Sequence, residues 1–236
     1  MTLVADPNRW NDIWEWARDP GSRRSWLVDA NDGVIATAGI LQGFAGAGAS
    51  DRLLMFTATA ATIAGGLSTG GAKWAEDASE RESQLRIAHR EQVELEQDRD
   101  AEIQELIEHW ERRGLEPELA SAVALRLTEH DALAAQLEWE YGFDKPMPAA
   151  VPVLSGVTTC AAFVAGALIP LLITYFAPVN VETWAIVAAV VVALTLTSVV
   201  SARASQLSAA RTLGRSLIVG GLTLLVSYIA GDFLLG

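Results

Sequence analysis

The sequence predicts an all-α polytopic membrane protein with five transmembrane helices and a helical insert between the second and third of them. Three observations support this. Hydrophobic residues make up 51% of the 236 residues, although the formal net charge is −12. Apolar and charged residues lie in separate blocks instead of alternating at helical spacing. The segment 74–147 alone accounts for the net charge, because it holds 20 acidic and 8 basic residues while the rest of the chain holds nine of each.

Five segments are long and apolar enough to cross a bilayer, which takes about 20 mostly apolar residues. They are 30–49, 53–73, 150–176, 184–202 and 213–235. Periodicity alone does not separate such segments from buried soluble helices. The lack of charge does, since no charged residue occurs in 33–50, 53–72 or 149–181.

Arginines predict how these spans are oriented. They precede the first span and surround the last loop, at Arg9, Arg18, Arg23, Arg24, Arg203, Arg211 and Arg215. The connections on the opposite side hold only Arg52. The positive-inside rule then puts the N-terminus and the insert in the cytoplasm and the C-terminus on the opposite side. The predicted parts are 1–25, the first two spans in 26–73, the acidic cytoplasmic domain in 74–147 and the last three spans in 148–236.

The N-terminal segment has one apolar helical face, formed by Trp10, Ile13, Trp14 and Ala17. This pattern is typical of a helix lying in the membrane interface. A cytoplasmic helix packed on the acidic domain fits it equally well. No basic stretch followed by an apolar run begins the sequence, so we expect no cleavable signal peptide.

Small residues recur at four-residue spacing in the first two spans, at Gly39, Gly43 and Ala47 and at Gly66 and Gly70. This spacing allows close contact between transmembrane helices. It predicts that the first two spans contact each other or a second subunit.

The acidic insert reads as one or two long helices over 74–113, followed by helices over 118–130 and 131–142, with Gly114 and Pro117 between them. At 100° per residue one strip about 80° wide on the first helix carries five carboxylates and an imidazole. These are Glu91, Glu94, Asp98, Glu102, Glu105 and His109. Like charges four residues apart repel by a few tenths of a kcal/mol per pair. A divalent ion such as Mn²⁺ or Fe²⁺ would relieve this repulsion, whereas a solvated face flanked by Arg90 and Arg99 is the plainer explanation.

Several other classes are disfavoured. None of the three histidines follows a glutamate by three residues, as di-iron bundles require, because Arg86, Leu106 and Leu127 stand there. No nucleophile–base set or phosphate-binding loop suggests an enzyme. So acidic a cytoplasmic region also argues against nucleic acid as a partner.

Five motifs occur in order between residues 24 and 233. They are "DANDGVIATAGILQGFAGAG", "IAGGLSTGGAKWAEDASERE", "GLEPELASAVALRL" with "EWEYGF", "GALIPLL" and "RSLIVGGLTLLVSYIAGDFL". Each motif is weak alone, but their order resembles the vacuolar iron transporter family. Members of that family export cytosolic Fe²⁺ or Mn²⁺ in exchange for protons. The resemblance implies a bacterial-type member in the cell inner membrane, with no cofactor beyond the transported ion.

The resemblance also implies a homodimer whose ion path runs between the first two spans of each subunit. Asp32 of the Asp-Gly pair becomes the path carboxylate, with Asp29 and Thr69 beside it. Glu91, Glu94, Glu102 and Glu105 reproduce the family's metal-site spacing of +3, +8, +3, and Glu140 before "YGF" adds a fifth ligand. Asp98 and His109 complete the expected metal set.

The sequence departs from the family pattern at five positions. Gly65, Thr69 and Lys73 stand where the second span of the family carries acidic and methionine residues. Gln136 and Leu137 replace paired methionines. Loss of the sulfur ligands favours a harder ion such as Mn²⁺, or a weaker transporter. The alternative is a membrane-anchored metal-binding or regulatory protein that does not transport.

Overall fold

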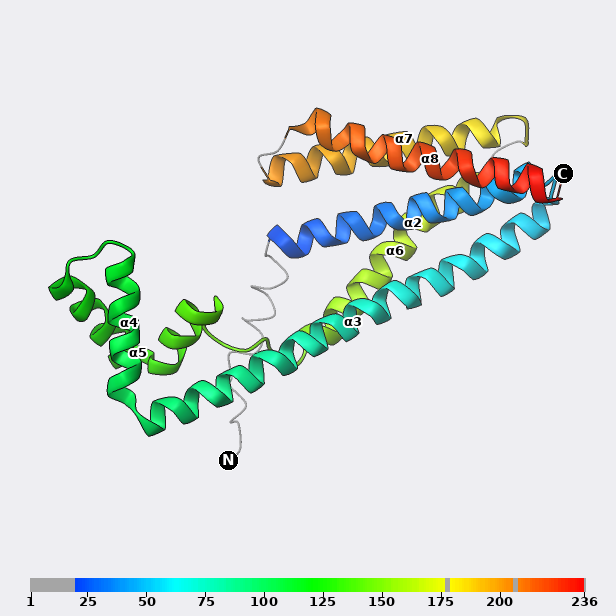
Figure 1. The fold of residues 1–236 in the computed structure, drawn as a ribbon. Helices are drawn as coiled ribbons and strands as arrows, with labels where there is room; N and C mark the ends of the chain where they lie inside the picture. The colour runs from blue at the N-terminus through cyan, green and yellow to red at the C-terminus, as the bar shows by residue number, and fades with distance from the viewer. Residues whose placement is uncertain (1–19, 177–178, 206–207, 236) are drawn as a thin grey trace. The chain divides into compact units, whose positions relative to one another are not determined.

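The computed structural model describes residues 20–176, 179–205 and 208–235 (Figure 1). Over these residues the chain forms seven α-helices and no strand, which confirms the all-α prediction. The helices are α2 (Pro20–Gly46), α3 (Asp51–Gln97), α4 (Arg99–Arg112), α5 (Pro117–Tyr141), α6 (Val151–Phe176), α7 (Val179–Ser205) and α8 (Ala209–Leu235). The amphipathic segment around Trp10 and Trp14 lies outside the described residues.

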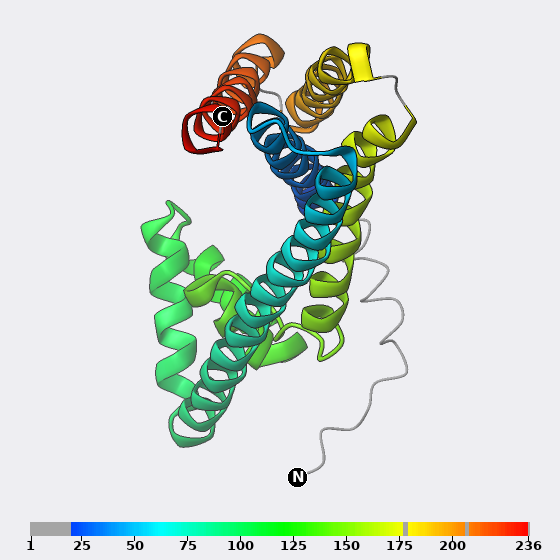
Figure 2. The ribbon, with the colours of Figure 1, turned by 90° about the vertical axis from the view of Figure 1, so that its right-hand side faces the viewer.

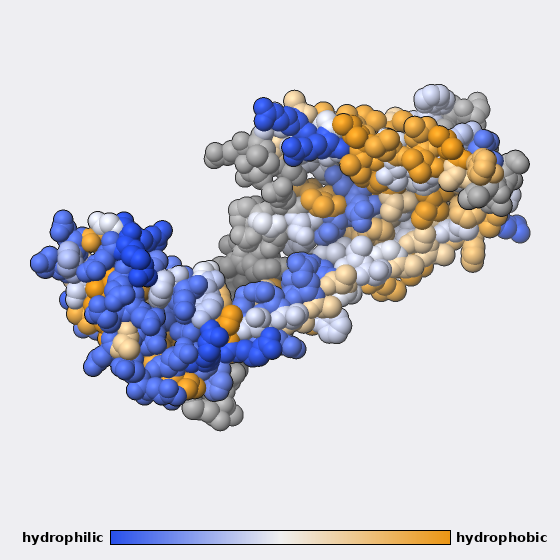
Figure 3. All heavy atoms as spheres, in the orientation of Figure 1, coloured by the Kyte–Doolittle hydropathy of each residue, from blue (hydrophilic) through white to orange (hydrophobic). Residues whose placement is uncertain are grey.

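The chain divides into two compact units. The membrane unit comprises Met1–Ala75 and Pro152–Gly236, and the acidic unit comprises Glu76–Val151. Helix α3 contributes to both. Hydrophobic residues gather over α7 and α8 of the membrane unit, and hydrophilic residues cover most of the acidic unit (Figure 3).

Three helical segments among the described residues are long and apolar enough to cross a membrane. They lie within Asp51–Gln97, Val151–Phe176 and Ala210–Phe233, and Trp184–Val200 forms a shorter apolar helix. Helix α2 falls short of this criterion because Asp29, Asn31, Asp32 and Gln42 interrupt its apolar residues. The five-span topology therefore stays a prediction.

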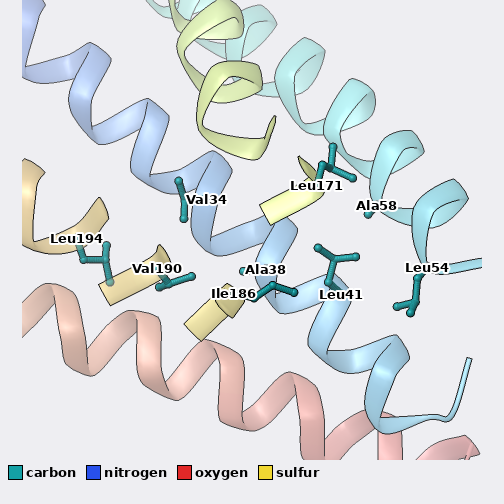
Figure 4. Packing of buried hydrophobic residues seen from close by; sticks show 9 residues of the cluster. All are labelled: Val34, Ala38, Leu41, Leu54, Ala58, Leu171, Ile186, Val190 and Leu194. Carbon is teal, nitrogen blue, oxygen red and sulfur yellow. The ribbon is translucent and has the colours of Figure 1, made fainter. Parts of the chain in front are cut away.

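Helix α2 is the central element of the membrane unit. It packs against α7 and α8, which also pack against each other (Figures 1 and 2). Buried side chains of α2 pack there against side chains from three other helices (Figure 4). This core consists of Val34, Ala38 and Leu41 from α2, Leu54 and Ala58 from α3, Leu171 from α6, and Ile186, Val190 and Leu194 from α7. By contrast, α8 exposes a broad apolar surface that includes Ile218, Leu222 and Val226.

The small residues of the first two spans contact other helices of the same chain. Gly39 and Gly43 of α2 face α8 at Ser227, and Gly66 and Gly70 of α3 face α6 at Cys160. The first alternative, in which these glycines join the first two spans of one chain, is therefore wrong for the described residues, and contact with a second subunit stays a prediction. Each glycine row instead lets its helix approach a helix from the second half of the chain.

The acidic unit has its own small core, in which α4 packs against α5. Leu106, Ala124 and Ala135 are buried there, with Trp110 and Trp139 packed against them. Gly142 ends α5 in a left-handed conformation with φ of 79°. This is the C-terminal signal that glycine supplies best.

The predicted helices of the acidic domain agree with the structure. Within α5 the backbone turns extended at Asp131, so the predicted helices 118–130 and 131–142 are confirmed as two helices joined by a kink. The segment 74–113, predicted as one or two long helices, divides into two at Asp98, whose side chain accepts a hydrogen bond from the Ala101 N–H at 3.1 Å. Asp98 is an N-cap, a role that aspartate fills well.

Candidate functional site

Glu91, on the last part of α3, is a buried carboxylate with only 1% of its surface exposed. The Tyr141 hydroxyl donates a hydrogen bond to Glu91 Oε1 at 3.3 Å. Arg90 Nη2 lies 3.8 Å from the same oxygen and also donates to the Tyr141 hydroxyl oxygen. The Arg90 guanidinium further lies 5.6 Å from the centre of the Tyr141 ring. The end of α5 thus closes over a carboxylate of α3.

These contacts do not offset the cost of burying Glu91. Burial, followed by the charges of Glu140 and Glu94, raises the pKa of Glu91 to about 7. The pKa of the Tyr141 hydroxyl rises to about 12 through burial and its position beside Glu140. Glu91 is therefore a carboxyl group that exchanges its proton near neutral pH.

Glu102 of α4 belongs to the same electrostatic group. Burial raises its pKa, and Glu105, Glu94, Glu140 and Asp98 add to the shift. Carboxylates from α3, α4 and α5 thus repel one another within one unit. No three acidic, histidine or cysteine side chains of the described residues, however, lie close enough together to hold a metal ion. The arrangement concentrates negative charge without forming a coordination shell.

The carboxylate strip does not continue along a single helix. Because α3 ends at Gln97, the strip divides between α3 and α4, and Asp98 serves as the cap between them. The His109 ring packs against two indoles, with its centroid 5.3 Å from that of Trp110 and 4.5 Å from that of Trp139. Burial lowers the pKa of His109, and Arg113 and Arg112 lower it further, which favours the neutral imidazole.

Gln136 is a structural residue that sequence reasoning did not identify. Its side chain is buried, its Nε2 donates to the Glu102 carbonyl at 2.6 Å, and its Oε1 accepts from Trp139 Nε1 at 2.6 Å. The Gln136 amide thus ties α5 to α4. The signal available in the sequence is a glutamine inside the apolar run "ALAAQLEW".

Polar side chains of α2 bind three neighbouring helices in the membrane unit. Thr159 of α6 donates to Asp29 Oδ2 at 2.9 Å. Asn31 Nδ2 donates to Thr197 Oγ1 of α7 at 2.6 Å. The hydroxyls of Thr37 and Thr62, on α2 and α3, lie 3.3 Å apart. Asp29 therefore has a partner within the chain, and these pairs were not expected from the sequence.

The other two predicted path residues differ from Asp29. Asp32 is exposed on the surface of α2. The Thr69 hydroxyl donates to the carbonyl oxygens of Gly65 at 2.9 Å and Gly66 at 3.3 Å, so its proton is used within α3. A Cβ atom on Gly65 would lie 2.6 Å from the Phe163 ring, which already fills the space of any side chain there.

Apolar helices of membrane-spanning length, joined to a compact unit rich in carboxylates, define an integral membrane protein with an acidic helical domain. The family model of the VIT family matches residues 23–232, and the chain belongs to this family. The predicted resemblance is confirmed. Members of the family are transporters, which agrees with the expectation that the chain is not an enzyme.

Curated relatives have about 30% sequence identity with the chain. Vacuolar iron transporter 1 of Eucalyptus grandis is 31% identical over 173 residues, covering 72% of this chain and 68% of that protein. The vacuolar iron transporter of Acanthamoeba castellanii is 30% identical over 158 residues, covering 67% of this chain and 57% of that protein. Vacuolar iron transporter 2 of Oryza sativa subsp. japonica is 29% identical over 157 residues, or 63% of its length.

Proposed function

We propose that the protein is a secondary transporter that moves Fe²⁺ or Mn²⁺ out of the cytoplasm in exchange for protons. The observation that carries the proposal is Glu91, buried beside the charges of Glu140 and Glu94 with a pKa of about 7. A carboxylate so placed gains most from a divalent cation, which would replace its proton and relieve the repulsion. Oxygen ligands of this kind suit hard and borderline metals.

In this proposal the acidic unit collects the ion and the membrane unit conducts it. Glu91, Glu94, Glu102, Glu105 and Glu140 raise the local cation concentration, with Asp98 and His109 nearby. The ion then passes to Asp32, with Asp29 and Thr69 along its way. Family membership and the concentration of acidic residues in one unit support this division.

The path itself requires a second subunit in this proposal. Asp32 is exposed on α2, so it is available to a partner. A dehydrated divalent ion needs several oxygen ligands, and two subunits meeting through their first two spans would double the carboxylates available. We further propose five spans in a bacterial inner membrane, with the N-terminus and acidic unit in the cytoplasm and the C-terminus on the opposite side.

Uptake into proteoliposomes tests the transport proposal. The purified chain should move Fe²⁺ or Mn²⁺ across the membrane, and a pH gradient should increase the rate. Asp32→Asn should reduce flux by at least about tenfold, because it removes the path charge. Asp51→Asn, an exposed acid in the first turn of α3, is the matched control and should leave flux unchanged. Absence of flux for Fe²⁺, Mn²⁺, Co²⁺ and Zn²⁺ in a folded preparation would contradict transport.

The second candidate is a membrane-anchored metal-binding protein without transport. It is favoured by the second span, where Phe163 fills the space beside Gly65 and the Thr69 hydroxyl donates within its own helix. This candidate predicts Mn²⁺ binding in calorimetry but no flux. In both candidates, replacing Glu102 and Glu105 by alanine should weaken Mn²⁺ binding.

A further inference from the structure

A cavity of about 330 Å³ lies between α4 and α5 in the acidic unit. His109, Trp110 and Arg113 line it from the end of α4, Glu138 and Trp139 line it from α5, and Leu106 adds an apolar wall. Its volume is at the lower end of the range for small-molecule sites, so it suits a ligand of one ring. Of the residues that line it, only His109 has a predicted role, as a member of the expected metal set.

Three rings give the cavity an aromatic wall. The His109 ring lies edge-on to Trp110 at 80° and is tilted by 47° against Trp139. Rings at such distances and angles attract further rings, because aromatic groups prefer offset or edge-to-face contacts. The wall therefore selects a planar, unsaturated ligand over an aliphatic one.

The charge at the cavity selects an anion. Aromatic walls often bind cations, but here the chain supplies its own, since the Arg113 guanidinium lies 5.8 Å from the centre of the Trp110 ring. Arg112 has Glu108 at 3.8 Å, whereas no carboxylate within ion-pair distance of Arg113 is found in the described part of the chain. Arg113 is thus a cation beside an aromatic wall that is available to an anion.

Two further polar groups refine the ligand. The Trp110 Nε1–H is buried and has no hydrogen-bond acceptor among the described residues, so a ligand reaches it only if the indole turns. Glu138 is an exposed acceptor that also lines the cavity. An anionic ligand tolerates Glu138 best when it turns a hydroxyl group toward that carboxylate.

We propose that this cavity binds a small hydroxy-substituted aromatic carboxylate, with its ring against His109 and Trp139 and its carboxylate on Arg113. Guanidinium and carboxylate match in planar geometry, and this pair is the strong contact of the site. A ligand bound here would touch both α4 and α5 and would hold the two helices together one turn beyond Glu105. The inference does not depend on the transport proposal.

Calorimetry on the full-length protein in detergent tests it with 4-hydroxybenzoate and benzoate. We expect one saturable site for 4-hydroxybenzoate, weaker binding of benzoate, and a loss of about tenfold in affinity in Arg113→Gln. Arg126→Gln is the matched control, because Arg126 is an exposed arginine of the same unit that pairs with Glu129. It should bind as the unchanged protein does.

Two further probes complete the test, a carboxylate without a ring and an aromatic cation. Acetate should show no saturable binding, and benzyltrimethylammonium should bind more weakly than benzoate. The proposal is overturned if neither aromatic acid saturates, if acetate binds equally well, if the aromatic cation binds better, or if Arg113→Gln changes nothing. Flux measurements do not enter these outcomes, so failure here leaves the transport proposal intact.

Discussion

The two units of this chain differ in what surrounds their polar side chains. In the membrane unit partly buried polar side chains of α2 hydrogen-bond to hydroxyl groups of other helices, as Asp29 does with Thr159 and Asn31 with Thr197, although Asn31 Oδ1 has no partner among the described residues. In the acidic unit Glu91 is buried beside further carboxylates. Burying a polar group costs free energy unless a partner satisfies it. Hydrogen bonds between helices thus serve the polar side chains of the membrane unit, whereas the acidic unit places carboxylates beside one another, as the proposed metal binding requires.

The largest expected effect concerns the close helix contacts of the membrane unit. A Cβ atom on Gly166 of α6 would clash with the backbone of α2, because it would lie only 1.9 Å from the carbonyl oxygen of Ala30. Gly166→Ala should therefore lower the free energy of unfolding by about 3 kcal/mol, since backbone atoms move aside only at high cost. Thermal unfolding in detergent measures this loss.

Gly71→Ala is the matched control for this variant. Gly71 also lies inside a helix, but nothing stands within 4 Å of its added Cβ. Alanine there should leave stability unchanged or raise it slightly, because alanine favours helix more than glycine does. Equal losses in the two variants would show that helix approach at Gly166 is not what holds α2 on α6.

The next effect concerns the buried carboxylate of the acidic unit. The pKa of Glu91 is about 7 in the fold against an ordinary 4.5. Between these values the folded protein keeps a proton that the unfolded chain has lost, so the free energy of unfolding falls as pH rises from 4.5 to 7. Glu91→Gln removes this penalty and should stabilise the protein at pH 8 by on the order of 2 kcal/mol, with little change near pH 4.

Mn²⁺ sharpens this prediction. If the site takes a cation, Mn²⁺ should stabilise the unchanged protein more at pH 8 than at pH 6, because the metal competes with the proton on Glu91. The Glu91→Gln variant should lose most of this pH dependence. Thermal unfolding of the unchanged protein and of the variant, with and without Mn²⁺ at pH 6 and pH 8, measures this dependence. A variant that is less stable than the unchanged protein at pH 8 would contradict the assigned repulsion.

These features differ in how far the sequence determines them. The all-α class follows from apolar block length, and the helix break at Asp131 follows from a capping side chain placed between two helical stretches. The position of the break at Asp98 escaped prediction because neither glycine nor proline marks it. Which helices the glycine rows of α2 and α3 contact also escaped prediction, since spacing identifies a close contact but not the partner.

Of the candidate site, the sequence supplied the acidic residues but not their surroundings. Charge pattern identified Glu91 and Glu102 and the family resemblance added Glu140, yet only the fold shows that the charge of Glu140 acts on both of the others. The Gln136 hydrogen bonds joining α5 to α4 depend on tertiary packing, which no local pattern encodes. For the same reason the cavity beside Trp110 and Trp139 has no signature beyond two tryptophans.

A smaller effect is expected at Gln136. Gln136→Met restores the family's residue type but removes the hydrogen bonds to the Glu102 carbonyl and from the Trp139 indole. Since the two groups left behind are partly buried, the free energy of unfolding should fall by about 1.5 kcal/mol. Calorimetric Mn²⁺ and Fe²⁺ titrations of the same variant show whether the thioether shifts preference toward Fe²⁺. Unchanged stability would mean that the amide bridge contributes nothing to the α4–α5 contact.

The smallest effect is expected at Thr159, in the membrane unit. Thr159→Val keeps the shape of the side chain and removes only the hydrogen bond to Asp29. Hydrogen bonds between membrane helices contribute about 0.6 kcal/mol on average, because the polar group finds other partners when one is lost. Thr197→Val, which removes the acceptor of Asn31, should cost a similar amount. A loss of several kcal/mol in Thr159→Val alone would mean that Asp29 is charged and depends on this one donor, so that the membrane unit also holds an unsatisfied carboxylate.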